Sequence, residues 1–181
     1  MYIKNVYNIS NNKQEICILT HNVKIIIRLL LLLAVMTAIF CFSSQPANES
    51  QALSDSLLDR IGRFLSFLPA FEEDPGKNIR KWAHFFEFAC LGFLSCMFFS
   101  ELNVSYKGRF ARTALISPVF CFLYALSDEI HQIFVPGRAC RLRDLFIDSA
   151  GALAGIAFAF VILYLLNRKA GHSDNEDTSA R

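Results

Sequence analysis

The sequence lacks the patterns that mark several common classes of protein. None of its six cysteines belongs to a C-x-x-C pair, so neither a zinc knuckle nor a disulfide framework is indicated. No block rich in lysine and arginine is present, which argues against a nucleic-acid partner. No serine stands in a G-x-S-x-G setting, and a serine hydrolase of that type therefore has no support. These absences direct attention to the apolar runs and to the polar groups that interrupt them.

The chain is very apolar for its size. Its 181 residues are 54% hydrophobic and include 18 phenylalanines, and the formal net charge is only +2. Several apolar runs approach the length of about 20 residues that a helix needs to cross a bilayer. A soluble domain of this size rarely carries so many apolar side chains, so the composition indicates an integral membrane protein with one domain.

Four apolar runs predict four transmembrane helices, at Val23–Phe42, Trp82–Phe99, Phe110–Phe134 and Leu145–Leu166. The first run begins late and is followed by FSSQPANES instead of an A-x-A cleavage site, so we interpret it as an uncleaved helix and not as a signal peptide. The predicted fold class is an all-α polytopic membrane protein, with an amphipathic helix after the first of its four spans. We expect a cytoplasmic N-terminal tail at 1–22, the membrane domain at 23–167 and a polar C-terminal tail at 168–181.

The amphipathic helix is predicted from apolar residues that recur at helical spacing before Pro69. They are Leu53, Leu57, Leu58, Ile61, Phe64, Leu65 and Leu68. Such a helix either lies on the membrane surface or packs against the bundle, and the pattern leaves both interpretations open.

Lysine and arginine near the ends of the spans predict the orientation in the plasma membrane. Four spans place both termini on one side. The flanks on that side carry Lys13, Lys24, Arg28, Lys107, Arg109, Arg112, Arg168 and Lys169, so we expect both termini in the cytoplasm. The opposite side also carries basic residues, namely Lys77, Arg80, Lys81, Arg138, Arg141 and Arg143, which we interpret as retained for a site.

Three of the predicted spans carry polar side chains on one helical face near this outer end. The groups are Lys81, His84 and Glu87 in the second span, Asp128, Glu129, His131 and Gln132 in the third, and Asp144 and Asp148 in the fourth. Arg138 follows the Pro136-Gly137 turn after the third span. A charge at the centre of a bilayer costs about 2.5–3.5 kcal/mol on insertion scales. We therefore expect these ten side chains to converge on one polar cavity, where they can pair with each other and with water.

Three interpretations of this cluster remain. The first is a structural network of ion pairs, such as Arg138 with Asp144 or Lys81 with Asp128, that holds the helices together. The second is acid–base catalysis, with His131 or His84 as the base, Asp128 or Glu129 orienting it, and Arg138 holding an anion. The R-x-x-x-x-x-H-x-x-x-D spacing of membrane lipid-phosphate phosphatases is absent.

The third interpretation is a metal site. His84-x-x-Glu87 and Asp128-x-x-His131 place a carboxylate and an imidazole one turn apart on two helices, as in carboxylate-bridged metal bundles. The match is partial, because the first pair has the reversed order and no second pair of glutamates is evident. We expect neither a metal nor another cofactor.

Four segments together resemble the VanZ family of small bacterial membrane proteins. They are FSSQ after the first span, KWAHFFEF in the second, SDEIHQ-x-FVPGR after the third, and RD-x-x-x-D-x-x-G-x-x-x-G in the fourth. The characteristic polar positions of the family match the ten side chains above and Gly151, while Phe88 stands where tyrosine is expected. The resemblance implies a VanZ-like membrane protein of the cell envelope. The namesake of the family is tied to low-level resistance to the glycopeptide antibiotic teicoplanin.

Two functions from different classes follow from these residues. In the first, the protein binds or modulates a cell-envelope lipid or peptidoglycan precursor in an extracytoplasmic pocket, with Lys81 and Arg138 on anionic groups. In the second, it is an enzyme that acts on a lipid headgroup, with His131 as acid and base and Asp128 as the partner that orients it. Membrane lipid is the expected partner in both, and the sequence leaves the oligomeric state open.

Overall fold

The computed structural model describes the backbone of residues 2–53, 56, 75–102 and 108–179, and the side chains of residues 18–53, 56, 79–102 and 108–168. Every regular element in this part of the chain is a helix. The long helices are α1 (Tyr2–Ser43), α3 (Pro75–Leu102), α4 (Arg109–Gln132) and α5 (Leu142–Ser179), and residues 47–53 form a short additional helix. An apolar chain in lipid must satisfy its backbone hydrogen bonds within each segment, which favours helices. The prediction of an all-α membrane protein is confirmed.

Each of the long helices contains a segment that is long and apolar enough to cross a membrane. These segments are Ile18–Ser43, Ile79–Leu102, Arg109–Gln132 and Leu142–Arg168. Large apolar side chains on them are exposed outside the bundle, for example Leu30 (60%), Leu115 (68%) and Phe158 (60%). A soluble protein would bury such groups, whereas lipid tails cover them at no cost. The four predicted spans are confirmed.

The two helices at the chain ends are longer than the sequence indicated. Helix α1 begins at Tyr2 and α5 continues to Ser179, so residues 2–22 and 168–179 of the segments expected as tails continue the helices of the spans. Neither range contains proline, and adding a residue to a helix that has already formed costs little. The amphipathic helix predicted between Leu53 and Leu68 lies almost wholly outside the described residues.

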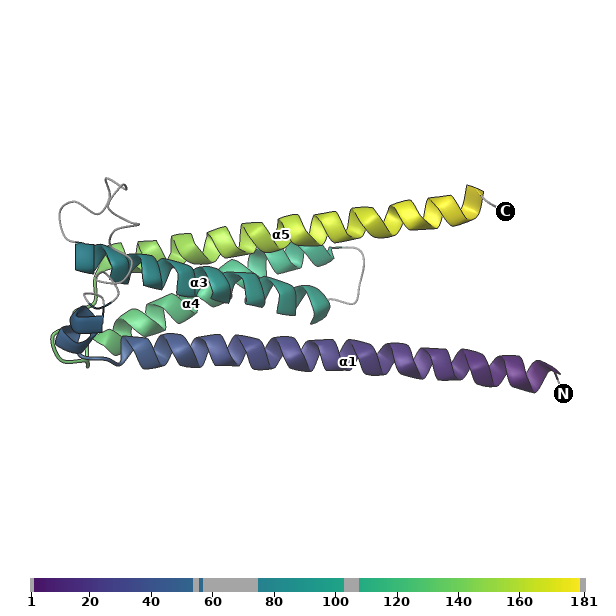
Figure 1. Ribbon diagram of the computed structural model, residues 1–181, viewed down its shortest axis with the longest axis horizontal. Helices are drawn as coiled ribbons and strands as arrows, with labels where there is room; N and C mark the ends of the chain where they lie inside the picture. Colours follow the sequence, from purple (N-terminus) through teal and green to yellow (C-terminus); the bar gives the residue numbers. More distant parts are fainter. Residues whose placement is uncertain (1, 54–55, 57–74, 103–107, 180–181) are drawn as a thin grey trace.

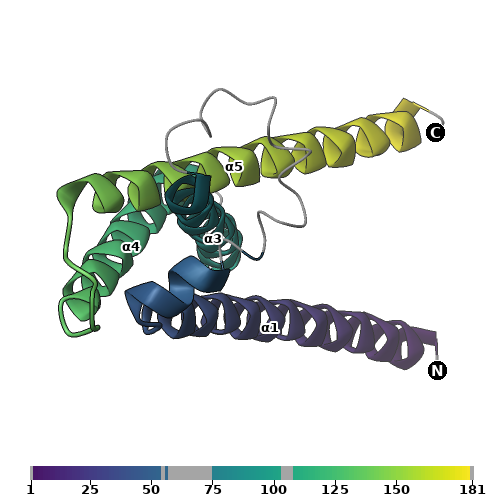
Figure 2. The same ribbon diagram turned by 60° about the vertical axis from the view of Figure 1, so that its left-hand side comes forward.

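Helix α3 has the most extensive contacts in the bundle: it packs against α1, α4 and, above all, α5. In two views α1 and α5 lie on opposite sides of it (Figures 1 and 2). Both termini lie at one end of the bundle, and the connection between α4 and α5 lies at the other (Figure 1). We call this second end the pocket end.

Glycines allow α3 and α5 to pack at very short range. A Cβ atom added at Gly151 would overlap the carbonyl of Phe85, and one added at Gly155 would overlap the carbonyl of Ala89. From the other side, a Cβ atom at Gly92 would overlap the carbonyl of Ala152. The G-x-x-x-G pair of the fourth span therefore serves a contact within one chain, which is the use that small residues have in membrane helices.

The interior between the helices is filled mainly by apolar side chains. Its buried apolar members are Leu32, Ile39, Phe88, Leu91, Cys96, Cys121, Ala125, Ala152, Ile156, Ala159 and Leu163. The Tyr124 hydroxyl donates to the carbonyl of Met36 at 2.6 Å and so links α4 to α1. This interior holds the helices that carry the polar groups of the pocket end in a fixed relation.

Candidate functional site: a polar pocket at one end of the bundle

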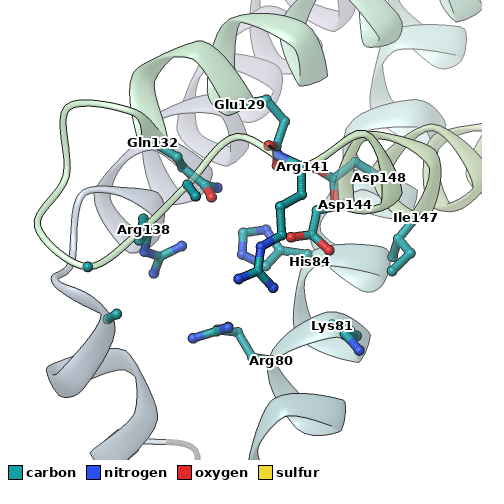
Figure 3. A pocket seen from close by; sticks show the side chains of 13 residues that line it. Arg80, Lys81, His84, Glu129, Gln132, Arg138, Arg141, Asp144, Ile147 and Asp148 are labelled. Carbon is teal, nitrogen blue, oxygen red and sulfur yellow. Dashed lines mark hydrogen bonds between the residues drawn. The ribbon is translucent and has the colours of Figure 1, made fainter.

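A cavity of about 100 Å³ opens at the pocket end of the bundle (Figure 3). Its wall comes from the first turns of α3, the last turns of α4, the α4–α5 connection, the start of α5 and one residue after α1. The lining residues are Ala47, Arg80, Lys81, His84, Glu129, Gln132, Gly137, Arg138, Ala139, Arg141, Asp144, Ile147 and Asp148. Segments far apart in the sequence therefore meet around a single polar hollow.

Helix α3 contributes basic groups and one histidine. Arg80 and Lys81 lie near its start, and His84 follows one turn deeper. Figure 3 shows the guanidinium groups of Arg80, Arg138 and Arg141 around the His84 ring. The Nδ1 atom of His84 lies 3.8 Å from Glu87 Oε2, the next polar group along the same helix.

The last turns of α4 contribute two buried acids and an amide. Asp128, Glu129 and Gln132 are 4%, 1% and 6% exposed. Asp128 Oδ2 accepts hydrogen bonds from Ser43 Oγ (2.8 Å) and from Gln132 Nε2 (3.0 Å). Glu129 Oε2 accepts the backbone N–H of Arg141 at 2.8 Å, which fixes the end of the connection beside α4.

The connection between α4 and α5 is anchored to the end of α1. Gly137 has a φ of +76°, which only glycine adopts without strain, and this allows the Pro136-Gly137 turn. The Pro136 carbonyl accepts the backbone N–H of Ala47 at 3.2 Å. Arg138 donates from Nε to the carbonyl of Gln45 (2.9 Å) and from Nη2 to the carbonyl of Phe42 (3.2 Å). Carbonyls at a helix end have no partner within the helix, so this arginine supplies one.

The start of α5 places two more acids one turn apart in the pocket wall. Asp144 is half-buried and Asp148 is only 2% exposed. The Asp148 Oδ2 atom is buried and has no hydrogen-bond partner. A buried carboxylate oxygen without a partner costs about 1–3 kcal/mol or more, so this group calls for an explanation.

The pocket is lined by both basic and acidic side chains. Four basic side chains, Arg80, Lys81, Arg138 and Arg141, line it together with the three acids Glu129, Asp144 and Asp148. Burial lowers the pKa of the Arg138 guanidinium, and the neighbouring Arg80 lowers it further. Among the residues described here, neither of the ion pairs that would make this a simple structural network, Arg138 with Asp144 and Lys81 with Asp128, is formed. Within the described part of the chain, none of these four cations is paired with a carboxylate, and Arg138 donates to two backbone carbonyls.

Seven of the ten side chains predicted from the sequence line the pocket, namely Lys81, His84, Glu129, Gln132, Arg138, Asp144 and Asp148. Asp128 lies behind the wall, between Ser43 and Gln132, and Glu87 lies beside His84. His131 does not line the pocket. Its ring stacks on Phe40 with the ring centres 4.5 Å apart, and its Nε2 atom lies 3.0 Å from Ser44 Oγ.

Three residues at the pocket were not among the candidates predicted from the sequence. Arg80 was predicted only as a basic residue of the outer side, and Arg141 shared the polar face of the fourth span without being a candidate, yet both line the pocket. Ser43 is fully buried and donates to Asp128. The FSSQ segment after the first span was the available signal for it, because two serines directly after an apolar run often bond to a neighbouring element.

The profile of the VanZ/LLP1 family matches residues 28–164, which include every residue that lines the pocket. The chain belongs to the VanZ/LLP1 family. No match was found among curated proteins or among solved structures. This VanZ/LLP1 protein is thus a membrane protein with four apolar helices, as the resemblance implied, and its ligand has to be argued from the pocket itself.

Proposed function

We propose that this VanZ/LLP1 protein binds the phosphate-bearing headgroup of a cell-envelope lipid in the polar pocket. The observation that carries the proposal is the set of four basic side chains around one small cavity, without an ion-pair partner among the described residues. Arginine binds phosphate oxygens through two parallel N–H donors, so a cluster of arginines suits such a ligand.

The size of the cavity supports a headgroup and not a whole precursor. A water molecule takes about 30 Å³ in the liquid, so the cavity of about 100 Å³ has room for a group of roughly three waters. That is enough for a phosphate with its nearest substituent. The rest of a lipid would remain outside, with its acyl chains beside the exposed apolar faces of the helices.

The position of the pocket also supports a lipid ligand. Arg80 and Lys81 lie at the start of the span Ile79–Leu102, and Asp144 lies at the start of the span Leu142–Arg168. Residues at span ends lie at the depth of lipid headgroups. We place this end on the extracytoplasmic face of the plasma membrane, because the other flanks carry Lys24, Arg28, Arg109 and Arg112.

The test compares lipids and matched arginine variants. The purified full chain is incubated in detergent with phosphatidylglycerol or with diacylglycerol of the same acyl chains, and bound lipid is counted by native mass spectrometry. Phosphatidylglycerol should bind and diacylglycerol should not. Arg141→Gln should weaken this binding about tenfold or more, since it removes a charge-assisted hydrogen bond worth about 1.5–3 kcal/mol.

Arg143→Gln is the matched control for Arg141→Gln. Arg143 lies two residues further on, is exposed and is not among the residues that line the pocket. It should leave binding unchanged. Equal binding of diacylglycerol, or equal effects of the two substitutions, would show that the pocket is not the lipid site.

The same two variants give a readout in cells. We infer that any tolerance of teicoplanin that this protein confers depends on an occupied pocket. Expression in a susceptible bacterium should then raise the inhibitory concentration for the wild type and for Arg143→Gln, but not for Arg141→Gln. Tolerance that persists in Arg141→Gln would separate it from the pocket.

The enzymatic alternative has less support than binding. It rested on His131 with Asp128 as the partner that orients it, yet each of these side chains contacts different residues. His84 is the histidine that lines the pocket. An acid–base mechanism would therefore have to use His84, and no observation favours that over binding.

A further inference from the structure

Three side chains from three helices approach each other beside the pocket. They are His84 of α3, Asp128 of α4 and Asp148 of α5, and one ligand atom of each lies within 4.8 Å of the ligand atoms of the other two. In a tetrahedral Zn²⁺ site the ligand atoms lie about 2.0–2.2 Å from the metal and therefore roughly 3.4 Å from one another. At the 4.8 Å limit, each of the three atoms would have to move roughly 0.7 Å towards their common centre to reach that bonding distance.

The charge of this cluster is not balanced by the protein. Asp128 and Asp148 are 4% and 2% exposed, and in the described part of the chain no lysine or arginine forms an ion pair with either. The Asp148 Oδ2 atom and the His84 Nδ1 atom are buried without a hydrogen-bond partner. Buried carboxylates are ordinarily paired with a cation or bound to a metal.

We propose that His84, Asp128 and Asp148 bind one divalent transition-metal ion, Zn²⁺ or Mn²⁺. Imidazole suits zinc and its neighbours in the first transition row, and carboxylates suit manganese, so a mixed set accepts both. Three protein ligands leave at least one position open, as in metal sites that also bind a water or a ligand. Because His84 and Asp148 also line the cavity, the ion lies in the pocket wall with that position accessible from the cavity.

The surroundings of the cluster resemble the outer shell of a metal site. Ser43 Oγ and Gln132 Nε2 both donate to Asp128 Oδ2, which holds this carboxylate and leaves its other oxygen available. Such donors orient metal ligands from outside the coordination sphere. Glu87 Oε2 lies 3.8 Å from His84 Nδ1, which is beyond hydrogen-bond distance, so it adds a further carboxylate close to the cluster without binding the ring.

Spacing within single helices does not reveal this cluster. His84 with Glu87, and Asp128 with His131, gave only a partial match. The cluster instead takes one ligand from each of three helices, and His131 is not part of it.

The test measures metal binding by itself, without lipid. The full chain, carrying no polyhistidine tag, is purified in detergent, stripped with a chelator and titrated with MnCl₂ while the free ion is followed by electron paramagnetic resonance. Manganese is the first probe because the exposed thiols Cys41, Cys90 and Cys140 would take up zinc. We expect one Mn²⁺ ion per chain and its displacement by Zn²⁺ added in excess of the exposed thiols.

Asp148→Asn and Asp144→Asn form a matched pair for this titration. Both replace an acid of α5 that lines the pocket, but only Asp148 belongs to the cluster. Asp148→Asn should weaken Mn²⁺ binding more than about tenfold, since even changes outside the first shell of ligands typically cost that much. Asp144→Asn removes a nearby charge but no atom of the cluster, so it should weaken Mn²⁺ binding much less than Asp148→Asn does.

A second variant guards against misfolding. Should Asp148→Asn not give a monodisperse protein, His84→Asn, at a half-buried position, serves in its place with the same expected loss. The proposal is overturned if the folded wild type takes up no Mn²⁺ or Zn²⁺ at millimolar concentration, or if the Asp144→Asn control loses as much affinity as the cluster variant. Lipid binding is measured separately, so failure here leaves the proposed function standing, and the reverse also holds.

Discussion

At the scale of single residues, the pocket depends on side chains that are held by neighbours outside it. Asp128 does not line the cavity, but its position is set by Ser43 at the end of α1 and by Gln132 one turn away on α4. Arg138 lines the cavity while donating to two carbonyls at the end of α1. Helix α1 therefore has a part in the site, although it supplies none of the candidate ligands.

The buried hydrogen bond of Ser43 gives a prediction at this scale. Ser43→Ala leaves Asp128 with one donor fewer, so the free energy of unfolding should fall by about 1–3 kcal/mol. Denaturant titration of the purified protein in detergent measures the change. Ser127→Ala is the control, because Ser127 is exposed and bonds only to the Tyr124 carbonyl one turn earlier.

For that control we expect a change of less than about 0.5 kcal/mol, as for most surface substitutions. If the two serine variants were equally stable, the contact between Ser43 and Asp128 would contribute nothing.

At the scale of helices, the contact between α3 and α5 determines how closely the acids of α5 approach His84. Gly151 and Gly155 lie against the backbone of α3, one and two turns below Asp148. A second contact ties α1 to α3 near the opposite end, where Arg28 Nη1 donates to Glu101 Oε2 and to the Met97 carbonyl, both at 2.7 Å. Close packing and an ion pair thus fix α3 against its neighbours at different depths.

Gly155→Ala separates helix propensity from packing. Alanine favours a helix by about 0.8–1.0 kcal/mol over glycine, so propensity alone predicts a more stable protein. The added methyl group would instead meet the Ala89 carbonyl and push the helices apart, at a cost of about 1–3 kcal/mol. The expected result is lower stability, measured by denaturant titration.

Ala154→Leu is the control for this contact. Ala154 is exposed on α5, next to Gly155, and the larger side chain would project away from α3. The free energy of unfolding of the Ala154→Leu variant should match that of the wild type. An increase in stability for Gly155→Ala would contradict the close packing of α3 and α5.

At the scale of the whole molecule, the bundle has two ends with different roles. The termini lie at one end and the pocket lies at the other (Figure 1). The lipid proposal requires that the pocket end faces the outside of the cell, because the ligand is a component of the envelope.

Labelling of Cys140 tests this orientation. Cys140 is exposed in the connection that lines the pocket. In a variant that keeps only this cysteine, a membrane-impermeant maleimide should label intact cells. A variant that instead has Arg112→Cys, at an exposed position near the opposite end, should be labelled only after the cells are lysed. The reversed pattern would place the pocket in the cytoplasm.

The helices, the four spans and the end of the bundle where polar groups collect follow from the order of the amino acids. Apolar length sets the spans, and helical periodicity fixes which side chains share a face. Spacing alone placed Asp128, Glu129 and Gln132 on one face of the third span, and the structure buries all three.

Which polar groups face one another depends on how the helices pack in three dimensions. The rotation and separation of neighbouring helices depend on side-chain packing, here on glycines against carbonyls, and no spacing within one helix encodes them. For that reason the sequence did not reveal that His84 lies beside Asp128 and Asp148. Nor did it reveal that His131 contacts Phe40 and Ser44. The donor from α1 to Asp128, which is Ser43, likewise became visible only in the structure.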